Sequence, residues 1–311
     1  MTYQEVLALI REGENSGIEL KVGSTVREPG DDELAQMYQS SLRLNYGKTP
    51  VLQATIDDLD RSRIRSYLQF TLNYDITSDV SSLEHTMVNL ELMAMSEHGP
   101  VPTVNGILLF GKRPRRHLPQ SGIRSVAYRS TVEEYDAIED IVIDQAILPE
   151  LREDGRVLEP GLIERALQFI ARHAPPPNPL EGARNIHTSA YPESVLREVL
   201  TNAVAHRDYT IAGTDILLNI FSDRLEIRSP GRLPNGASIE AVQNGFRYHR
   251  NQVLMQALRD MRYVDGRGMG LRLKVIPTML QLAGKPPVFV ASETEFSVTL
   301  PKPQRIDENK D

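Results

Sequence analysis

The sequence of 311 residues contains no cysteine. Disulfides, thiolate metal sites and cysteine nucleophiles are therefore excluded. The sequence also lacks an apolar run approaching the roughly 18 residues that a membrane-spanning helix needs, so we expect no membrane partner. Residues 1–11 contain no short apolar core before a small-residue cleavage site, which argues against a secretory signal. These absences together predict a cytoplasmic protein.

Positive charge is also scarce, since 35 lysines and arginines stand against 42 aspartates and glutamates, a net charge of −7 at pH 7. Such a chain has no overall attraction to a phosphate backbone, and a DNA contact needs a local basic patch. The densest basic run offers four candidate nucleic-acid contacts, Lys112, Arg113, Arg115 and Arg116. The alternative is a solvated loop at a strand end, which the acidic total favours.

The length and the ordinary hydrophobic content of 40% allow two compact domains. Four prolines in the six residues Ala174–Pro179 indicate a stiff connector. A helix, a Gly-Pro turn and an apolar strand over residues 81–110 fit a small winged-helix-like element. Apolar spacing predicts helices over 31–42, 55–70, 81–96, 160–172, 192–206, 251–261 and 271–283, the last bent at Pro277. Strands are expected over 107–110, 123–129, 215–221, 225–229, 288–290 and 296–300.

The helix over 192–206 carries a polar stripe beside its apolar one. Glu198, Asn202 and His206 are spaced by four residues, so they lie on one helix face. A carboxylate one turn before an amide suits a metal-bound triphosphate. The amide oxygen can ligate Mg²⁺, and the carboxylate can orient or deprotonate a water molecule. A solvated helix face would carry the same three residues, so the pattern alone does not decide between the two interpretations.

A glycine loop lies directly before the last predicted helix. Gly266, Gly268 and Gly270 alternate with other residues and are followed by Leu271. Glycines let a backbone approach phosphates closely, and the amino terminus of the helix presents free amides. Arg250 and one helix separate this loop from the preceding hairpin, at the place where a lid over a ligand would lie.

The order of these features resembles the Bergerat fold of GHKL ATPases over about residues 161–300. The turn at Ser229–Gly231 looks like their first glycine box and 266–271 like their second. The resemblance implies Mg-ATP as the ligand, with Asn202 on the metal and Glu198 as the catalytic group. It implies nucleotide contacts from His206, Ser229, Gly231, Arg250, Gly266, Gly268, Gly270 and Leu271. GHKL proteins usually have an aspartate where Ser229 stands, and that aspartate binds the adenine amino group.

One branch of that family is especially similar, through residues 197–209 and 226–234. Its members are described as putative transcriptional regulators, or as proteins like the carboxy terminus of RecG helicase. The resemblance therefore implies DNA-linked regulation, with DNA and a second copy of the chain as partners. No helicase motor motif is present, so we expect no helicase activity.

In the same branch a Schlafen-type AlbA domain precedes the ATPase part, and Glu14–Lys21 looks like the opening of that domain. The sheet that should follow is missing, which predicts an internal deletion near Lys21. Glu14, Glu19 and Lys21 could begin a metal nuclease site, but no further carboxylate is found in a suitable context. Nuclease activity is therefore not expected.

The expected fold class is α+β, with a carboxy-terminal Bergerat-type sandwich of helices on a mixed sheet, preceded by a smaller, mostly helical α+β domain. We expect an AlbA-type remnant at 1–21, a middle region at 22–155, the ATP-binding domain at 156–302 and a charged tail at 303–311. The expected function is an ATP-binding switch that hydrolyses ATP weakly if at all. The alternative, favoured by Ser229, is a DNA-binding regulator that uses the fold as a non-hydrolysing scaffold.

Overall fold

The computed structural model describes residues 46–74, 80–175, 189–234, 237–245, 248–264 and 269–303. The expected AlbA-type remnant, the helix over 31–42 and most of the charged tail lie outside the described residues. None of the described helices is long and apolar enough to cross a membrane.

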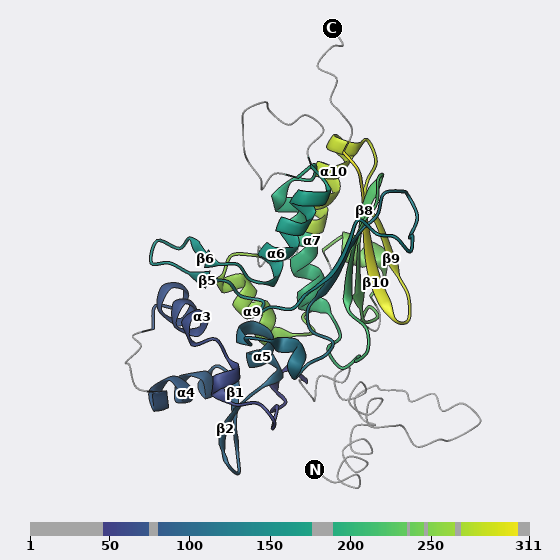
Figure 1. The fold of residues 1–311 in the computed structure, drawn as a ribbon. Coiled ribbons are helices and arrows are strands. Elements are labelled where there is room, and N and C mark those ends of the chain that lie inside the picture. The colour runs from purple at the N-terminus through teal and green to yellow at the C-terminus, as the bar shows by residue number, and fades with distance from the viewer. Residues whose placement is uncertain are drawn as a thin grey trace, which may run out of the picture.

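A six-stranded mixed sheet combines two strands from the first half of the chain with four from the second half (Figure 1). Its strand order is β4-β3-β7-β8-β10-β9. The β3–β7 pair is parallel and the other four pairs are antiparallel. The strands are β3 (Ile123–Ala127), β4 (Glu139–Ile143), β7 (Ile216–Ile220), β8 (Arg224–Pro230), β9 (Val288–Ala291) and β10 (Glu295–Pro301).

Three helices cover one face of this sheet, α6 (Leu162–His173), α7 (Glu193–His206) and α10 (Ile276–Ala283) (Figure 1). Buried side chains of α7 such as Val195 and Leu200 pack in the same core as Leu225 and Ile227 of β8. Alternation along β8 places every second side chain in this core. The expected α+β class, with helices on a mixed sheet, is therefore confirmed.

Between β8 and α10 the chain forms α8 (Ile239–Gln243), α9 (Gln252–Asp260) and a π-helical turn, η6 (Leu271–Val275). The irregular turn η6 lies directly before Pro277, where we expected a bend. Proline has no amide hydrogen to donate to the carbonyl one turn earlier, so regular helix geometry is not enforced there.

The first half contains short helices and two small hairpins. The helical pieces are η2 (Tyr46–Lys48), η3 (Ile56–Asp58), α3 (Arg61–Ser66), η4 (Tyr67–Thr71), α4 (Val80–Asn89), α5 (Val104–Phe110) and η5 (Pro114–Arg116). The hairpins are β1 (Met93–Ser96) with β2 (Gly99–Pro102), and β5 (Glu150–Leu151) with β6 (Val157–Glu159). Strands β3 and β4 belong to the large sheet although they precede residue 156, where we expected the ATP-binding domain to begin. The expected domain boundaries stay predictions.

Three sequence-based assignments in this half are wrong. The strand expected over 107–110 is part of α5, which begins where the Thr103 hydroxyl accepts a hydrogen bond from the amide of Gly106. A short apolar run fits a buried helix as well as a buried strand. The helix expected over 81–96 ends at Asn89, because Glu91 has a φ of 61° and turns the chain into β1. The helix expected over 55–70 is interrupted at Leu59, whose backbone is extended.

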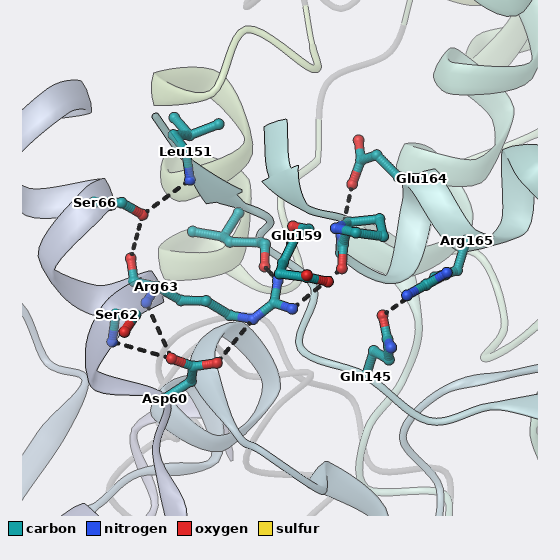
Figure 2. A network of polar contacts seen from close by, with 12 residues as sticks. Asp60, Ser62, Arg63, Ser66, Gln145, Leu151, Glu159, Glu164 and Arg165 are labelled. Carbon is teal, nitrogen blue, oxygen red and sulfur yellow. Dashed lines mark hydrogen bonds and ion pairs between the residues drawn. The ribbon is translucent and has the colours of Figure 1, made fainter. Parts of the chain in front are cut away.

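A buried arginine joins the first half of the chain to the segment that leads into the second half, and Figure 2 shows its contacts. Arg63 of α3 pairs with Asp60 at 3.2 Å and donates to the carbonyls of Leu148 at 2.7 Å and Pro160 at 3.2 Å. Nearby, the amide of Gly161 donates to Glu164 in the first turn of α6. Helix α3 is thus fixed to the chain segment that leads into α6.

Candidate functional site

A cavity of about 160 Å³ lies between α7, β8, β10 and the segment that runs from β8 to η6. Its apolar lining includes Val199 and Ala203 of α7, Ile227 of β8, Met255 of α9 and Val298 of β10. Polar side chains from α7 and from residues 248–259 complete the lining. A partly apolar cavity with a few convergent polar groups is the usual form of a small-molecule site.

The structure places eight of the predicted site residues around this one cavity: Glu198, Asn202, His206, Ser229, Gly231, Arg250, Gly270 and Leu271. Gly266 and Gly268 lie outside the described residues. Four further polar residues that sequence reasoning missed also line the cavity: Arg232, Tyr248, His249 and Arg259. The only sequence signal for them is the cluster of basic residues around Arg250.

Glu198 and Asn202 interact directly. The Asn202 amide nitrogen donates to Oε1 of Glu198 at 3.1 Å, so the nitrogen faces the carboxylate and the amide oxygen is left as an acceptor. Among the described residues no three His, Cys, Asp or Glu side chains form a metal cluster. Mg²⁺ often has few protein ligands and completes its shell with phosphate oxygens and water. The Asn202 oxygen fits that role, with the remaining ligands supplied by a bound phosphate compound.

Gly270 approaches the Glu198 carboxylate more closely than any other residue type would allow. A Cβ atom at position 270 would lie 2.0 Å from Oε1 of Glu198. The φ of Gly270 is −59°, which every residue adopts easily, so a side chain at this position conflicts only with the present position of the Glu198 carboxylate. The last glycine of the second predicted glycine box thus lies against the predicted catalytic carboxylate.

Ser229 lines the cavity as a hydrogen-bond acceptor. Its buried hydroxyl donates to the carbonyl of Ala203 at 2.7 Å. A hydroxyl has a single proton, so the lone pairs of this oxygen stay available to a ligand donor. Two residues later, Gly231 has a φ of 122°, and a Cβ there would lie 2.3 Å from Nη1 of Arg250. Both the conformation and the space require glycine at 231.

Arginine side chains give the cavity local positive charge. Arg250 donates to the carbonyls of His206 at 2.9 Å and Arg232 at 2.7 Å, while Nη2 of Arg259 lies 2.8 Å from Nε2 of His249. Within the described part of the chain no carboxylate pairs with Arg250 or Arg259. The described residues therefore leave two positive charges beside the cavity without an ion-pair partner, although the whole chain is acidic.

His206 is neutral at pH 7. Burial, with smaller electrostatic contributions from His249 and Arg250, lowers its pKa from the ordinary value of 6.5 to about 4. Its ring stacks on that of His249 with 6.5 Å between the centroids. His206 can therefore offer a ligand a neutral hydrogen bond, whereas the positive charge comes from the arginines.

The basic run at 112–117 lies outside this cavity, and most of its side chains contact the protein itself. Lys112 donates to the carbonyl of Asp57, and Arg115 pairs with Asp215 and donates to the carbonyl of Ser121. Arg116 lies 3.7 Å from Asp58. The nucleic-acid contacts expected from Lys112, Arg113, Arg115 and Arg116 stay a prediction.

Comparison with known proteins agrees with this geometry. A family described as the carboxy-terminal part of putative ATP-dependent DNA helicase RecG matches residues 213–300, which run from the start of β7 into β10. The match supports an ATPase-like family, and an ATPase-like domain implies nucleotide binding. The match begins after α7, so it does not include Glu198 or Asn202. No curated protein matches the chain.

A solved structure, that of the DIP2311 protein from Corynebacterium diphtheriae, has a similar fold. The two chains are 19% identical with a TM-score of 0.58, and the similarity covers 92% of this chain and 53% of that one. The chain thus spans about half the length of that protein. At this identity the likeness concerns the fold alone, and the expected AlbA-type relationship stays a prediction.

Proposed function

We propose that the cavity binds ATP together with Mg²⁺ and that the chain works as a nucleotide-dependent switch. One observation carries this proposal: a partly apolar cavity contains the Glu198–Asn202 pair together with Arg250 and Arg259, neither of which pairs with a carboxylate of the described residues. Such a lining suits a ligand with an apolar base and several negative charges. Along α7, Glu198 and His206 are eight residues apart, about 12 Å at 1.5 Å per residue, so one elongated ligand can contact both.

Each polar group has a separate role in this proposal. The Ser229 oxygen accepts a hydrogen bond from the amino group of adenine. Its proton is donated to the carbonyl of Ala203, so its lone pairs are free for this contact. The Asn202 oxygen would be a ligand of the Mg²⁺ ion that accompanies the phosphates. When bound, Mg²⁺ neutralises part of the phosphate charge. Glu198 orients a water molecule for slow hydrolysis. Arg250 and Arg259 lie toward the His206 end of α7 and favour an anionic ligand through their charge.

A series of nucleotides tests this function on the full chain by calorimetry in the presence of Mg²⁺. We expect the affinity to fall by about tenfold or more from ATP to AMP, because the arginines act on phosphate charge. We expect ATP to bind more tightly than GTP, and Ser229→Ala to reduce that preference, because guanine has no amino group at the corresponding position. Equal affinities for ATP and AMP, or no saturable binding at all, would reject the proposal.

The substitution Gly270→Ala gives a second, local test. The added methyl group would displace the Glu198 carboxylate from Asn202, so we expect Mg-ATP affinity to fall by roughly tenfold. The carboxylate ends a flexible side chain, and alanine is favoured over glycine in a helix by about 1 kcal/mol, so stability should hardly change. Calorimetry gives the affinity and thermal unfolding gives the control. Unchanged affinity would show that the close approach of Gly270 has no role in binding.

The DNA-binding alternative has less support than nucleotide binding. Arg115 pairs with Asp215 and Arg116 lies 3.7 Å from Asp58, whereas Lys112 donates to the backbone carbonyl of Asp57. The two ion pairs reduce the charge that the run can offer to a phosphate backbone. We therefore place the switch function on the nucleotide cavity, and treat a link to transcription as secondary to it.

A further inference from the structure

We infer that Lys274 is a positioning residue that compensates the charge of Glu198 when an anionic ligand occupies the cavity. This inference rests on the proposed function. Lys274 lies in the turn η6, four residues after Gly270, and its Nζ atom is 3.5 Å from Oε2 of Glu198. The Glu198 side chain is 7% exposed and that of Lys274 is 40% exposed, so the lysine reaches a buried carboxylate from the surface side.

The compensating charge can be traced to Lys274 by examining the other partners of Glu198. Its Oε1 atom accepts from the uncharged amide of Asn202, which supplies no positive charge. The neighbouring Arg197 pairs instead with Glu164 at 2.9 Å and Glu193 at 2.7 Å. Within the described part of the chain, Lys274 is therefore the one cationic side chain paired with Glu198.

Tyr263 shows why Arg197 cannot replace Lys274 in this role. The Arg197 guanidinium lies over the Tyr263 ring, 4.9 Å from its centroid, and the Tyr263 hydroxyl donates to Glu164 at 2.6 Å. Arg197 is thus held by two carboxylates and an aromatic ring on another side of α7. Turning it toward Glu198 would leave Glu164 buried without its cation, which is energetically unfavourable.

Electrostatics gives Lys274 its importance during binding. A buried carboxylate without a cation is strongly disfavoured, and nearby phosphates would increase the repulsion. Lys274 offsets this repulsion, so the Glu198 carboxylate can lie beside a triphosphate. Contacts to both carboxylate oxygens, from Asn202 and Lys274, also fix the direction in which Glu198 faces the ligand.

A double-mutant cycle tests this inference through Mg-ATP affinity measured by calorimetry. We expect Lys274→Met to weaken binding by about tenfold, but by only about twofold when Glu198 is already glutamine, since the charge to be compensated is then absent. Lys274→Arg should restore affinity to within about threefold of wild type, because it keeps the charge. The loss caused by Lys274→Met should be smaller for AMP than for ATP.

Arg272→Met is the matched control, since it removes a positive charge from the same turn at an exposed position. It should change Mg-ATP affinity by less than about twofold if proximity to Glu198 is what matters. Equal losses from Lys274→Met with Glu198 and with glutamine would overturn the inference, as would no loss at all. A wild-type protein that binds no ATP would instead reject the proposed function, and this inference with it.

Discussion

Asn202→Ala is expected to lower the affinity for Mg-ATP by about 100-fold, or about 2.7 kcal/mol. The substitution removes the amide oxygen that fits Mg²⁺ and also the donor that holds Oε1 of Glu198 at 3.1 Å. Both losses act at the phosphate end of the ligand. Calorimetric titration of wild type and variant with Mg-ATP measures the effect, and thermal unfolding verifies that the variant is folded.

Two variants show whether the effect belongs to this position. Asn89→Ala makes the same change at the exposed last residue of α4, away from the cavity, and should leave the affinity unaltered. Asn202→Asp keeps an oxygen ligand and should retain part of the Mg²⁺ dependence. Binding of Mg-ATP by Asn202→Ala with wild-type affinity would contradict the assigned role.

Arg63→Ala is expected to lower the free energy of unfolding by about 3–5 kcal/mol, because it breaks a partly buried ion pair and leaves buried carbonyls without their donor. The substitution leaves Asp60 without its cation, and the buried carbonyl of Leu148 loses its donor (Figure 2). The carbonyl of Pro160 loses one as well. Urea unfolding followed by circular dichroism measures the change.

The neighbouring Arg61 provides the comparison for Arg63. It lies in the same helix and pairs with Asp57 at 2.8 Å, but at the surface, where the Asp57 side chain is 80% exposed. Exposed pairs contribute little, so Arg61→Ala should lower the free energy of unfolding by less than about 1 kcal/mol. Similar losses from both variants would show that burial does not determine the importance of Arg63.

Local patterns predicted the elements that carry the site. Helical spacing predicted one polar stripe made of Glu198, Asn202 and His206. In the structure these three residues lie on α7 and line one cavity. The two strands β7 and β8 were predicted because a tight turn at residues 222–224 separates two apolar runs. Helix α5 was missed because its apolar run is too short to show a period.

Other parts of the site depend on contacts between distant residues. Arg259 reaches the cavity because α9 is attached to the end of α7: Asn251 donates to the carbonyls of Ala205 at 2.9 Å and Arg207 at 2.8 Å. No local spacing contains that information. Lys274 was missed for a similar reason, since the π-helical geometry of η6 changes which side chains of this turn face α7.

The most direct test of the nucleotide-binding role is a calorimetric titration of the full chain with ATP, once with Mg²⁺ and once with EDTA. We predict saturable binding at a single site with Mg²⁺ and much weaker binding with EDTA. Asn202 offers an oxygen ligand to the metal, and without the metal the Glu198 carboxylate repels the phosphate charge. Absence of binding at millimolar ATP, or equal binding with Mg²⁺ and EDTA, would contradict the proposed Mg-ATP site.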